Sequence, residues 1–279
     1  MMAKKTPPSA GRLIRILLLV GFAVYILIPI SWMLASSLRS PLDSFKMPPA
    51  ILPTQFLLDS YNLVFEKVDF GKFLKNSVIV SLSSTALQVV CSSMAAFAFS
   101  RFRFPGKNVL FIAFLCSMMV PSAVMSIPRF IIMKNLGLID RYGALILPAM
   151  FSAIGIFMIR QFMMTIPKSY DEAAYIDGAG RIYCFFRIVG PMAKPAMMVI
   201  AVQTFIGTWN DFYNPLIFIN SESKMTLPLG LTALWGRLGT GSRSAVLAGV
   251  ILSLIPPLLF YVAGQRFLIE GINLGGLKG

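Results

Sequence analysis

Six long stretches of this chain contain no aspartate, glutamate, lysine or arginine. A helix needs about 20 mostly apolar residues to cross the hydrocarbon core of a bilayer, so each stretch is a candidate transmembrane helix. The fifth stretch ends at Asp211, but the chain stays mostly apolar as far as Ile219, and we interpret Asp211 as an intramembrane or interfacial acid. The pattern therefore predicts an all-α, polytopic membrane protein with six transmembrane helices. The stretches are 16–38, 76–100, 108–128, 142–159, 195–210 and 244–265, with lengths of 23, 25, 21, 18, 16 and 22 residues.

The low content of charged residues excludes the main alternatives to a membrane protein. Charged residues make up 13% of the chain and hydrophobic residues 57%, whereas a soluble domain has about 25% charged residues. So few charges cannot cover a water-facing surface, and a disordered chain does not keep so much apolar surface hydrated. The first stretch is also longer than the apolar part of a cleaved signal peptide, about 7–15 residues, and we expect it to be an uncleaved helix.

The chain contains few groups that could perform catalysis or hold a metal. It has no histidine, which is the commonest metal ligand and a frequent general base. Cys91, Cys116 and Cys184 stand apart and match no zinc-binding or disulfide spacing, so we expect them to be packing residues. Gly106-Lys107 lacks the upstream glycine of a phosphate-binding loop. We therefore expect no metal site, no cofactor and no ATP site in this chain.

The net charge of +14 is distributed unevenly over the predicted loops. With the N-terminus inside, the inner segments contain 14 of the 25 Lys and Arg and four of the 11 Asp and Glu, which gives +10 inside and +4 outside. The basic clusters at 101–107 and 160–194 both fall on the inner side. Cytoplasmic loops of membrane proteins are enriched in lysine and arginine. We therefore expect both termini in the cytoplasm, and we attribute the basic charge to anionic lipid rather than to nucleic acid.

The predicted loops contain no separate soluble domain, and we interpret residues 1–279 as a single transmembrane domain. A second outer loop, 129–141, is expected to contain a short interfacial helix. The first outer loop, 36–75, is longer and is marked by turn signals. These signals are Ser40-Pro41, Pro48-Pro49 and Pro53-Thr54.

The inner loop 160–194 is the longest predicted cytoplasmic segment, and its part 166–191 predicts a surface helix. Ser169 and Glu172 match a capping box, so a helix should begin at Ser169. Helical spacing places four residues on one face, where small alanine side chains would let another protein approach closely. These four residues are Tyr170, Ala173, Ala174 and Asp177.

Gly178 and Gly180 should end this helix, because glycine permits a sharp change of direction. A second short helix, about 181–189, should then lead into the fifth span. The result would be a helix–turn–helix element at the cytoplasmic surface. Two roles suit such an element: docking into a groove of a partner protein, or resting on lipid as an amphipathic loop.

The residues of this loop resemble the EAA loop of permease subunits of bacterial ABC importers. Glu172-Ala173-Ala174 is followed by Gly178 after three residues, by Ile188 after nine more, and by Gly190-Pro191. The departure from the family pattern is Gly190, where leucine is usual. Further similarity to the carbohydrate-importer subfamily, and to its shorter, maltose-type permease subunit, lies in Asn76-Ser77, Ala98-Phe99-Ser100-Arg101-Phe102, Trp209-Asn210-Asp211-Phe212 and the ending 265–279.

The resemblance implies the partners and the location of the protein. A permease of this kind pairs with a second, homologous permease, and an ATPase dimer that binds ATP and Mg lies beneath them. An extracytoplasmic solute-binding protein delivers the sugar, and this chain itself is not catalytic. The location implied is the cytoplasmic (inner) membrane of a bacterium or archaeon.

The resemblance also assigns roles to particular residues, and each role has a structural alternative. Contact with the ATPase would involve the coupling residues Glu172, Ala173, Ala174, Asp177 and Gly178, although Glu172 could instead serve only the helix cap. The C-terminal tail, 271–279, would reach the ATPase interface through Gly275, Gly276 and Lys278, or would be a frayed end. An outer gate or binding-protein contact would involve Asn210, Asp211 and Trp235; Asp211 could equally be a satisfied interfacial acid, and Trp235 an interfacial anchor.

A different function, that of a stand-alone secondary transporter or channel, remains as the alternative. Such a protein would show paired broken helices in an inverted repeat and ionisable groups near the membrane midplane. Neither feature is evident in this sequence.

The predicted topology is testable with reporter fusions. Fusions at Pro49 and at Lys168 should report opposite sides of the membrane, because the basic clusters place Lys168 inside with the N-terminus. Reports from the same side would contradict the six-helix topology.

Overall fold

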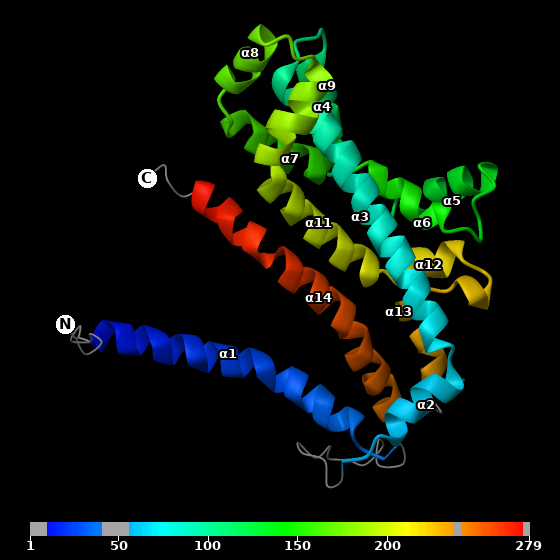
Figure 1. The fold of residues 1–279 in the computed structure, drawn as a ribbon. Helices are drawn as coiled ribbons and strands as arrows, with labels where there is room; N and C mark the ends of the chain where they lie inside the picture. The colour runs from blue at the N-terminus through cyan, green and yellow to red at the C-terminus, as the bar shows by residue number, and fades with distance from the viewer. Residues whose placement is uncertain (1–9, 41–55, 237–240, 276–279) are drawn as a thin grey trace. The chain divides into compact units, whose positions relative to one another are not determined.

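A computed structural model describes residues 10–40, 56–236 and 241–275, and within these ranges it contains helices, turns and no β-strand (Figure 1). The predicted all-α class is therefore confirmed for the described part. The chain divides into two compact units, Met1–Val68 with Leu231–Leu252 and Asp69–Gly230 with Ser253–Gly279. The last helix, α14 (Arg243–Gly275), contributes residues to both units. That the units form a single transmembrane domain stays a prediction.

The first unit contains α1 (Ala10–Ser37), α2 (Asp59–Lys67), the 3-10 helix η5 (Leu231–Trp235) and the beginning of α14. The apolar side chains of α1 are largely exposed, as suits a helix surrounded by lipid. Two hydrogen bonds tie the end of α1 to α2. Ser37 Oγ and Tyr61 Oη lie 2.8 Å apart, and Ser60 Oγ donates to the Arg39 carbonyl oxygen at 2.9 Å.

The second unit is built around one long helix, α3 (Phe70–Arg101), which packs mainly against α7 (Ala153–Thr165) and α11 (Lys194–Trp209). Small residues let these helices approach closely, as is usual where lipid supplies no hydrophobic force between helices. A Cβ atom on Gly155 of α7 would lie 2.7 Å from Ser92 Oγ of α3. On its other side α11 meets α14, where the rings of Phe205 and Phe260 stack with centroids 4.1 Å apart.

Shorter elements connect these helices. They are α4 (Lys107–Ser117), α5 (Ser126–Asn135), α6 (Gly143–Ile146), η2 (Leu147–Met150), α8 (Ser169–Ile176), α9 (Arg181–Tyr183), the π-helical η3 (Cys184–Val189), α10 (Gly190–Met192), α12 (Tyr213–Phe218), η4 (Glu222–Lys224) and α13 (Leu227–Gly230). Of these, α5 supplies the short helix predicted within 129–141, and α9 with η3 supplies the one predicted near 181–189.

Five of the six predicted spans have counterparts among the described helices. Four segments are long and apolar enough to cross a membrane, and a fifth arises if the pair Arg181–Met192 and Lys194–Trp209, bent by 76°, is counted as one broken span. The four are Ile14–Ser37, Phe70–Arg101, Gly143–Thr165 and Arg243–Phe267.

The stretch 108–128 differs from the other five. It forms α4, a helix of 11 residues, which is about 16 Å long at 1.5 Å per residue. Turns follow α4 as far as Met125, and Pro121 disfavours helix at the residue before it. A count of charge-free residues does not register such a helix breaker. Six transmembrane helices are compatible with the fold, and the number stays a prediction.

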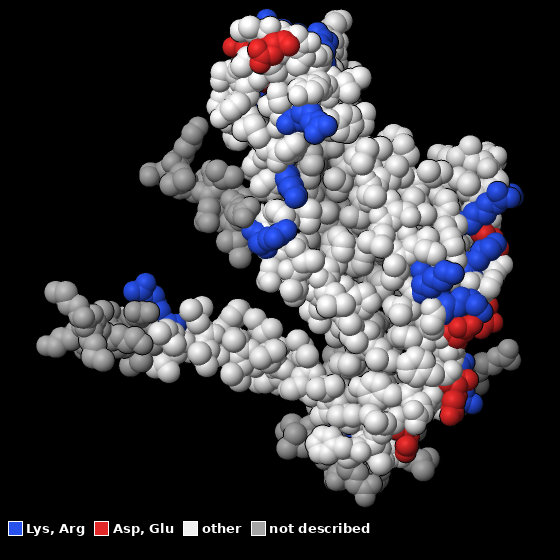
Figure 2. Space-filling model, in the orientation of Figure 1, with Lys and Arg blue, Asp and Glu red and all other residues white. Residues whose placement is uncertain are grey.

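Charged side chains of the second unit gather at its two ends. Figure 2 shows them around α8 and α9 at one end and near α5 and α12 at the other, whereas the surface over the middle of α3 is uncharged. The turn signals predicted at Pro48-Pro49 and Pro53-Thr54 lie outside the described residues, and the signal at Ser40-Pro41 lies at their edge.

Candidate functional site

The predicted surface helix of the inner loop is α8, and it begins at Ser169 as expected. Ile166 has the extended backbone that a residue before proline favours, which ends α7 and separates it from α8. The capping box, however, is wrong. The residue preceding the helix is Lys168, with α-helical backbone angles, and no side-chain cap hydrogen bond forms. Ser169 is therefore the first helical residue, and Glu172 donates its backbone N–H to the Lys168 carbonyl oxygen at 3.0 Å.

The C-terminal end of α8 depends on Gly178. The Ala179 N–H donates to the Ala174 carbonyl oxygen at 2.9 Å, and the Gly178 N–H donates to that of Tyr175 at 3.1 Å. This pair of bonds is a Schellman motif, which requires a left-handed residue at the position of Gly178. Gly178 has a φ of +79°, whereas Gly180 has an extended backbone with a φ of −78°. Of the two glycines predicted to end the helix, only Gly178 needs the freedom of glycine.

The two alanines of the loop lie in different surroundings. Ala173 is exposed, whereas Ala174 is 7% exposed and belongs to a core cluster of the chain itself. Asp171, three residues before Ala174, is also buried. The predicted face is therefore divided: Ala174 is buried, whereas Tyr170, Ala173 and Asp177 are exposed.

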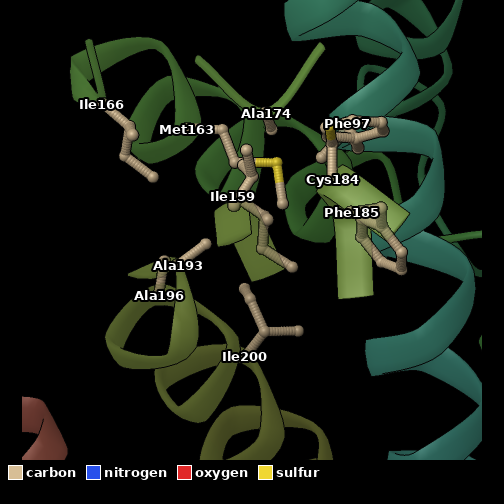
Figure 3. Packing of buried hydrophobic residues seen from close by; sticks show 12 residues of the cluster. Phe97, Ile159, Met163, Ile166, Ala174, Cys184, Phe185, Ala193, Ala196 and Ile200 are labelled. Carbon is tan, nitrogen blue, oxygen red and sulfur yellow. The ribbon is translucent and has the colours of Figure 1, made fainter. Parts of the chain in front are cut away.

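The cluster around Ala174 joins α8 to three long helices. Figure 3 shows Ala174 beside Met163 of α7 and Cys184 of η3, with Phe97 of α3 and Ile200 of α11 completing the group. Cys184 is fully buried there, in agreement with its expected packing role. Because the members come from five elements, α8 cannot shift without disturbing the packing of the spans.

A buried ion pair makes a second connection between α8 and the spans. Arg101 Nε, at the end of α3, lies 2.8 Å from Asp171 Oδ2 in the first turn of α8, and the two side chains are only 5% and 7% exposed. Arg101 Nη2 also donates to the Ile166 carbonyl oxygen at 3.0 Å. One guanidinium group thus holds together the ends of α3 and α7 and the beginning of α8.

Because Asp171 is buried, its charge and that of Arg101 each need the other as a partner. Burial raises the pKa of the Asp171 carboxyl above its ordinary value, and the Arg101 guanidinium opposes this shift. Removing one member of a buried ion pair costs about 3–5 kcal/mol, because the other charge is left without a partner in a medium of low polarity. The pair therefore specifies how α8 is oriented against α3.

Other basic residues neutralise the end of α3. Arg160 Nε donates to the Phe99 carbonyl oxygen at 3.2 Å, and Lys107 Nζ donates to that of Phe102 at 2.9 Å. Cations are favourable at a helix C-terminus, where the backbone carbonyl groups carry partial negative charge. Two members of the basic clusters noted in the sequence thus have a structural role at one end of the unit.

Asp211 lies near the other end of the second unit, just beyond α11. Its Oδ1 accepts the Asn214 backbone N–H at 3.1 Å and its Oδ2 accepts Asn214 Nδ2 at 2.6 Å. Asn214 Oδ1 in turn accepts Arg129 Nη1 of α5 at 3.3 Å. Asn210 is exposed and caps the end of α11. The carboxylate of Asp211 is thus satisfied locally, and a role at an outer gate stays a prediction.

A second acid at this end, Asp140, was not singled out in the sequence. Its Oδ1 accepts the backbone N–H groups of Asn220 and Ser221 at 3.0 and 2.9 Å. Its Oδ2 accepts Ser221 Oγ at 2.6 Å and Lys224 Nζ at 2.7 Å. These bonds hold the pKa of the Asp140 carboxyl well below its ordinary value, and the bond from Lys224 has the largest effect.

The contacts of Asp140 fix the segment that follows α12. Asp140 has a φ of 58°, a left-handed conformation that aspartate tolerates better than most residues. From α3, Asn76 Nδ2 donates to the carbonyl oxygens of Ser223 and Met225 at 3.0 and 2.9 Å. The pair Asn76-Ser77 had no role assigned from the sequence. Asn76 holds this segment, and Ser77 Oγ accepts the backbone N–H of Leu227, the first residue of α13, at 2.7 Å.

The remaining predicted site residues are dispersed. Trp235 is 47% exposed at the end of η5 in the first unit, and its carbonyl oxygen accepts the Gly241 N–H at 2.8 Å. Gly275 is the last residue of α14, whereas Gly276 and Lys278 lie outside the described residues. Within the described part of the chain, no group of three or more His, Cys, Asp and Glu is placed to hold a metal ion.

The family of the chain follows from comparison with known proteins. A family model described as "Binding-protein-dependent transport system inner membrane component" matches residues 88–271. The chain belongs to this family, and the family predicted from the inner loop is confirmed. The protein is thus a multi-pass membrane component of a binding-protein-dependent transport system.

Relatives match over nearly the full length. The chain is 30% identical over 284 residues to the arabinooligosaccharides transport system permease protein AraQ of Halalkalibacterium halodurans, with 100% of both chains covered. It is 31% identical to the sn-glycerol-3-phosphate transport system permease protein UgpE of Yersinia pestis, over 92% of this chain and 94% of that protein.

The fold also matches a solved structure. It is similar to the crystal structure of a bacterial ABC transporter involved in the import of the acidic polysaccharide alginate, with a TM-score of 0.80 and 23% identity over 95% of this chain and 100% of that chain.

Substitution of Gly178 should impair transport without preventing membrane insertion. In Gly178→Val a β-branched residue would have to adopt positive φ, with a strain of about 1–3 kcal/mol that distorts the end of α8. Gly180→Val is a matched control, because neither glycine has an atom within 4 Å of its ideal Cβ and only Gly178 has positive φ. Solute uptake by cells that contain equal amounts of each variant tests this, and equal uptake by both variants would contradict it.

Substitution of Asp171 should loosen α8. Asp171→Asn keeps the size of the side chain but leaves Arg101 as an unpaired buried charge, and we expect a loss of about 3–5 kcal/mol in the free energy of unfolding. Asp177→Asn is the control, since Asp177 is exposed at the C-terminal cap of the same helix. Thermal unfolding of the purified protein measures the effect, and a melting temperature equal to that of the control would show that the pair does not hold α8.

Proposed function

We propose that this chain is the permease subunit of an ABC importer for a sugar or oligosaccharide, and that α8 couples it to a partner ATPase. The observation that carries the proposal is the contrast between the two faces of α8. One face is anchored to the spans by Asp171 and Ala174. The other presents groups that another protein can contact.

The exposed face combines one charge with large apolar groups. Glu172 is exposed, Ile176 is 87% exposed, and Tyr170 and Tyr175 are 50% and 43% exposed. An exposed group of apolar side chains with polar residues around it is typical of a protein-binding surface. Glu172 makes no cap bond in α8, so its carboxylate is available for a basic residue of the partner. Ala173, Asp177 and Gly178 belong to the same surface in this proposal.

The anchored face explains how a displacement of α8 by the ATPase could be transmitted to the helices that span the membrane. Arg101 belongs to α3, and the core cluster includes residues of α3, α7 and α11. A rigid connection to three helices lets a displacement of α8 shift them together. ATP and Mg would be bound by the partner ATPase, and this chain would perform no catalysis. The orientation proposed places α8 and both termini in the cytoplasm.

The opposite end of the second unit suits contact with a solute-binding protein. The segment 220–225 is held by Asp140 and Asn76 in one conformation, which reduces the entropy lost on binding. Asn210 and Asp211 of the second unit, and separately Trp235 of the first unit, are proposed for an outer gate or a binding-protein contact. The tail residues Gly275, Gly276 and Lys278 are proposed for the ATPase interface. The names of the relatives support a sugar or sugar derivative as the solute. A second permease would complete the translocation pathway.

The proposal is tested with the reconstituted complex of both permeases, the ATPase and the binding protein. ATP hydrolysis should rise when the binding protein is loaded with the right member of a sugar panel. Glu172→Gln should lower stimulated hydrolysis and uptake at least tenfold, because removing one member of a partly buried charged pair costs about 2–5 kcal/mol. Ser169→Ala should behave as wild type, since Ser169 does not cap α8.

Two results would contradict the coupling role of Glu172. One is normal stimulation of the Glu172→Gln complex. The other is an equal loss in a control, Glu66→Gln, which changes an exposed acid of α2. No stimulation of the wild-type complex by any sugar of the panel would argue against a sugar as the solute.

A further inference from the structure

An apolar pocket of about 340 Å³ lies between the end of α3 and the helical segment that follows α8. Met94 and Phe97 of α3 form one wall, and Ile182 and Phe186 form the other. The volume falls within the range of about 300–1,000 Å³ that is typical of small-molecule sites. Phe97 and Phe185 line this pocket and also belong to the core cluster around Ala174.

One charged residue, Arg181, stands among the lining residues of the pocket. Its guanidinium carbon lies 4.7 Å from the centroid of the Phe102 ring. Among the described residues no carboxylate lies within ion-pair distance of Arg181. A guanidinium group stacked on a ring keeps its N–H donors at its edge, where they suit the oxygens of a phosphate. The part of the pocket at Arg181, here called the rim, therefore favours an anionic group.

The pocket extends from Arg181 along the last two turns of α3. Met94 precedes Arg101, the last residue of α3, by seven positions, which is about 10 Å along the helix. Its lining is open on one side, because Met94, Ile182 and Phe186 are 51%, 76% and 61% exposed, while Phe97 is buried. In the orientation proposed above, the rim lies at the cytoplasmic surface and the apolar walls lie at the depth of the inner leaflet.

We propose that this pocket binds an anionic phospholipid of the cytoplasmic leaflet, with an acyl chain between the apolar walls and the phosphate at Arg181. This inference rests on the proposed function only for the orientation of the membrane. An apolar helix of another subunit fits the site less well, because it would cover Arg181 without supplying a partner for its charge. Anionic headgroups are attracted to basic residues at the cytoplasmic surface.

Lipid binding is measured by native mass spectrometry of the delipidated complex with its ATPase. Phosphatidylglycerol and phosphatidylcholine with identical acyl chains are the two probes. We expect phosphatidylglycerol to bind about fivefold more tightly, which corresponds to ~1 kcal/mol for one basic residue at the membrane surface. Arg181→Gln should abolish this preference. Arg187→Gln should preserve it, since Arg187 is exposed in the same helical segment and does not line the pocket.

A second variant tests the apolar part of the site. Ala98 lines the pocket, and Ala98→Phe should weaken the binding of both lipids because the larger side chain occupies the space of the acyl chain. The spectrometer selects the assembled complex, so misfolded protein does not contribute. Equal binding of the two lipids to wild type, or an equal effect of Arg181→Gln and Arg187→Gln, would overturn the inference.

The two proposals fail in different ways. The lipid measurement requires neither transport nor an oriented membrane. Loss of sugar-stimulated hydrolysis would therefore leave it unaffected, whereas loss of the lipid preference would leave the coupling role of α8 intact. The reporter fusions at Pro49 and Lys168 decide separately whether the pocket faces the cytoplasmic leaflet.

Discussion

The ion pair between Arg101 and Asp171 is the interaction on which the arrangement of α8 against the ends of α3 and α7 depends. The guanidinium group contacts the carboxylate in the first turn of α8 and a carbonyl oxygen at the end of α7, while it belongs to the end of α3. A buried ion pair contributes little to stability compared with apolar side chains of similar size, but it is strongly unfavourable to break. Such a pair is therefore well suited to hold one orientation, which is what a helix between membrane spans and a partner protein requires.

The second unit holds its elements together differently at its ends and in its middle. Ion pairs and hydrogen bonds of charged groups act at the ends, beside apolar clusters. Arg101 and Asp171 act at one end, and Asp140, Asn220, Ser221 and Lys224 act at the other. In the middle, small side chains such as Gly155 against Ser92 allow close contact of the helices. This division follows from the solvent: lipid provides no hydrophobic force between helices, so packing must serve there, while charged groups stay near the aqueous boundaries.

Local sequence patterns succeeded where the physics is local. The charge-free stretches marked five of the six expected spans, because a lipid-exposed helix needs an apolar surface over its own length. The glycine at position 178 ended α8 because the Schellman motif involves only neighbouring residues.

Sequence patterns gave wrong predictions where another local conformation was available to the same residues, or where a distant residue determined the structure. The capping box at Ser169 was not used, since the helix started one residue earlier than that motif requires. The stretch after Ser117 was interrupted by turns although it contains no charge.

The sequence by itself determined that this is an all-α membrane protein, that its basic residues cluster in the predicted inner loops, and that a short helix with an EAA pattern lies in one of them. Each of these properties depends on composition or on residues within a few positions of one another. Only the tertiary structure decided which side of α8 is available. Ala174 became buried while Ala173 stayed exposed, and Asp171 found Arg101 across 70 positions of the chain. The physical reason is that burial and charge pairing depend on which helices lie against one another, and spacing along the chain carries no information about residues so far apart.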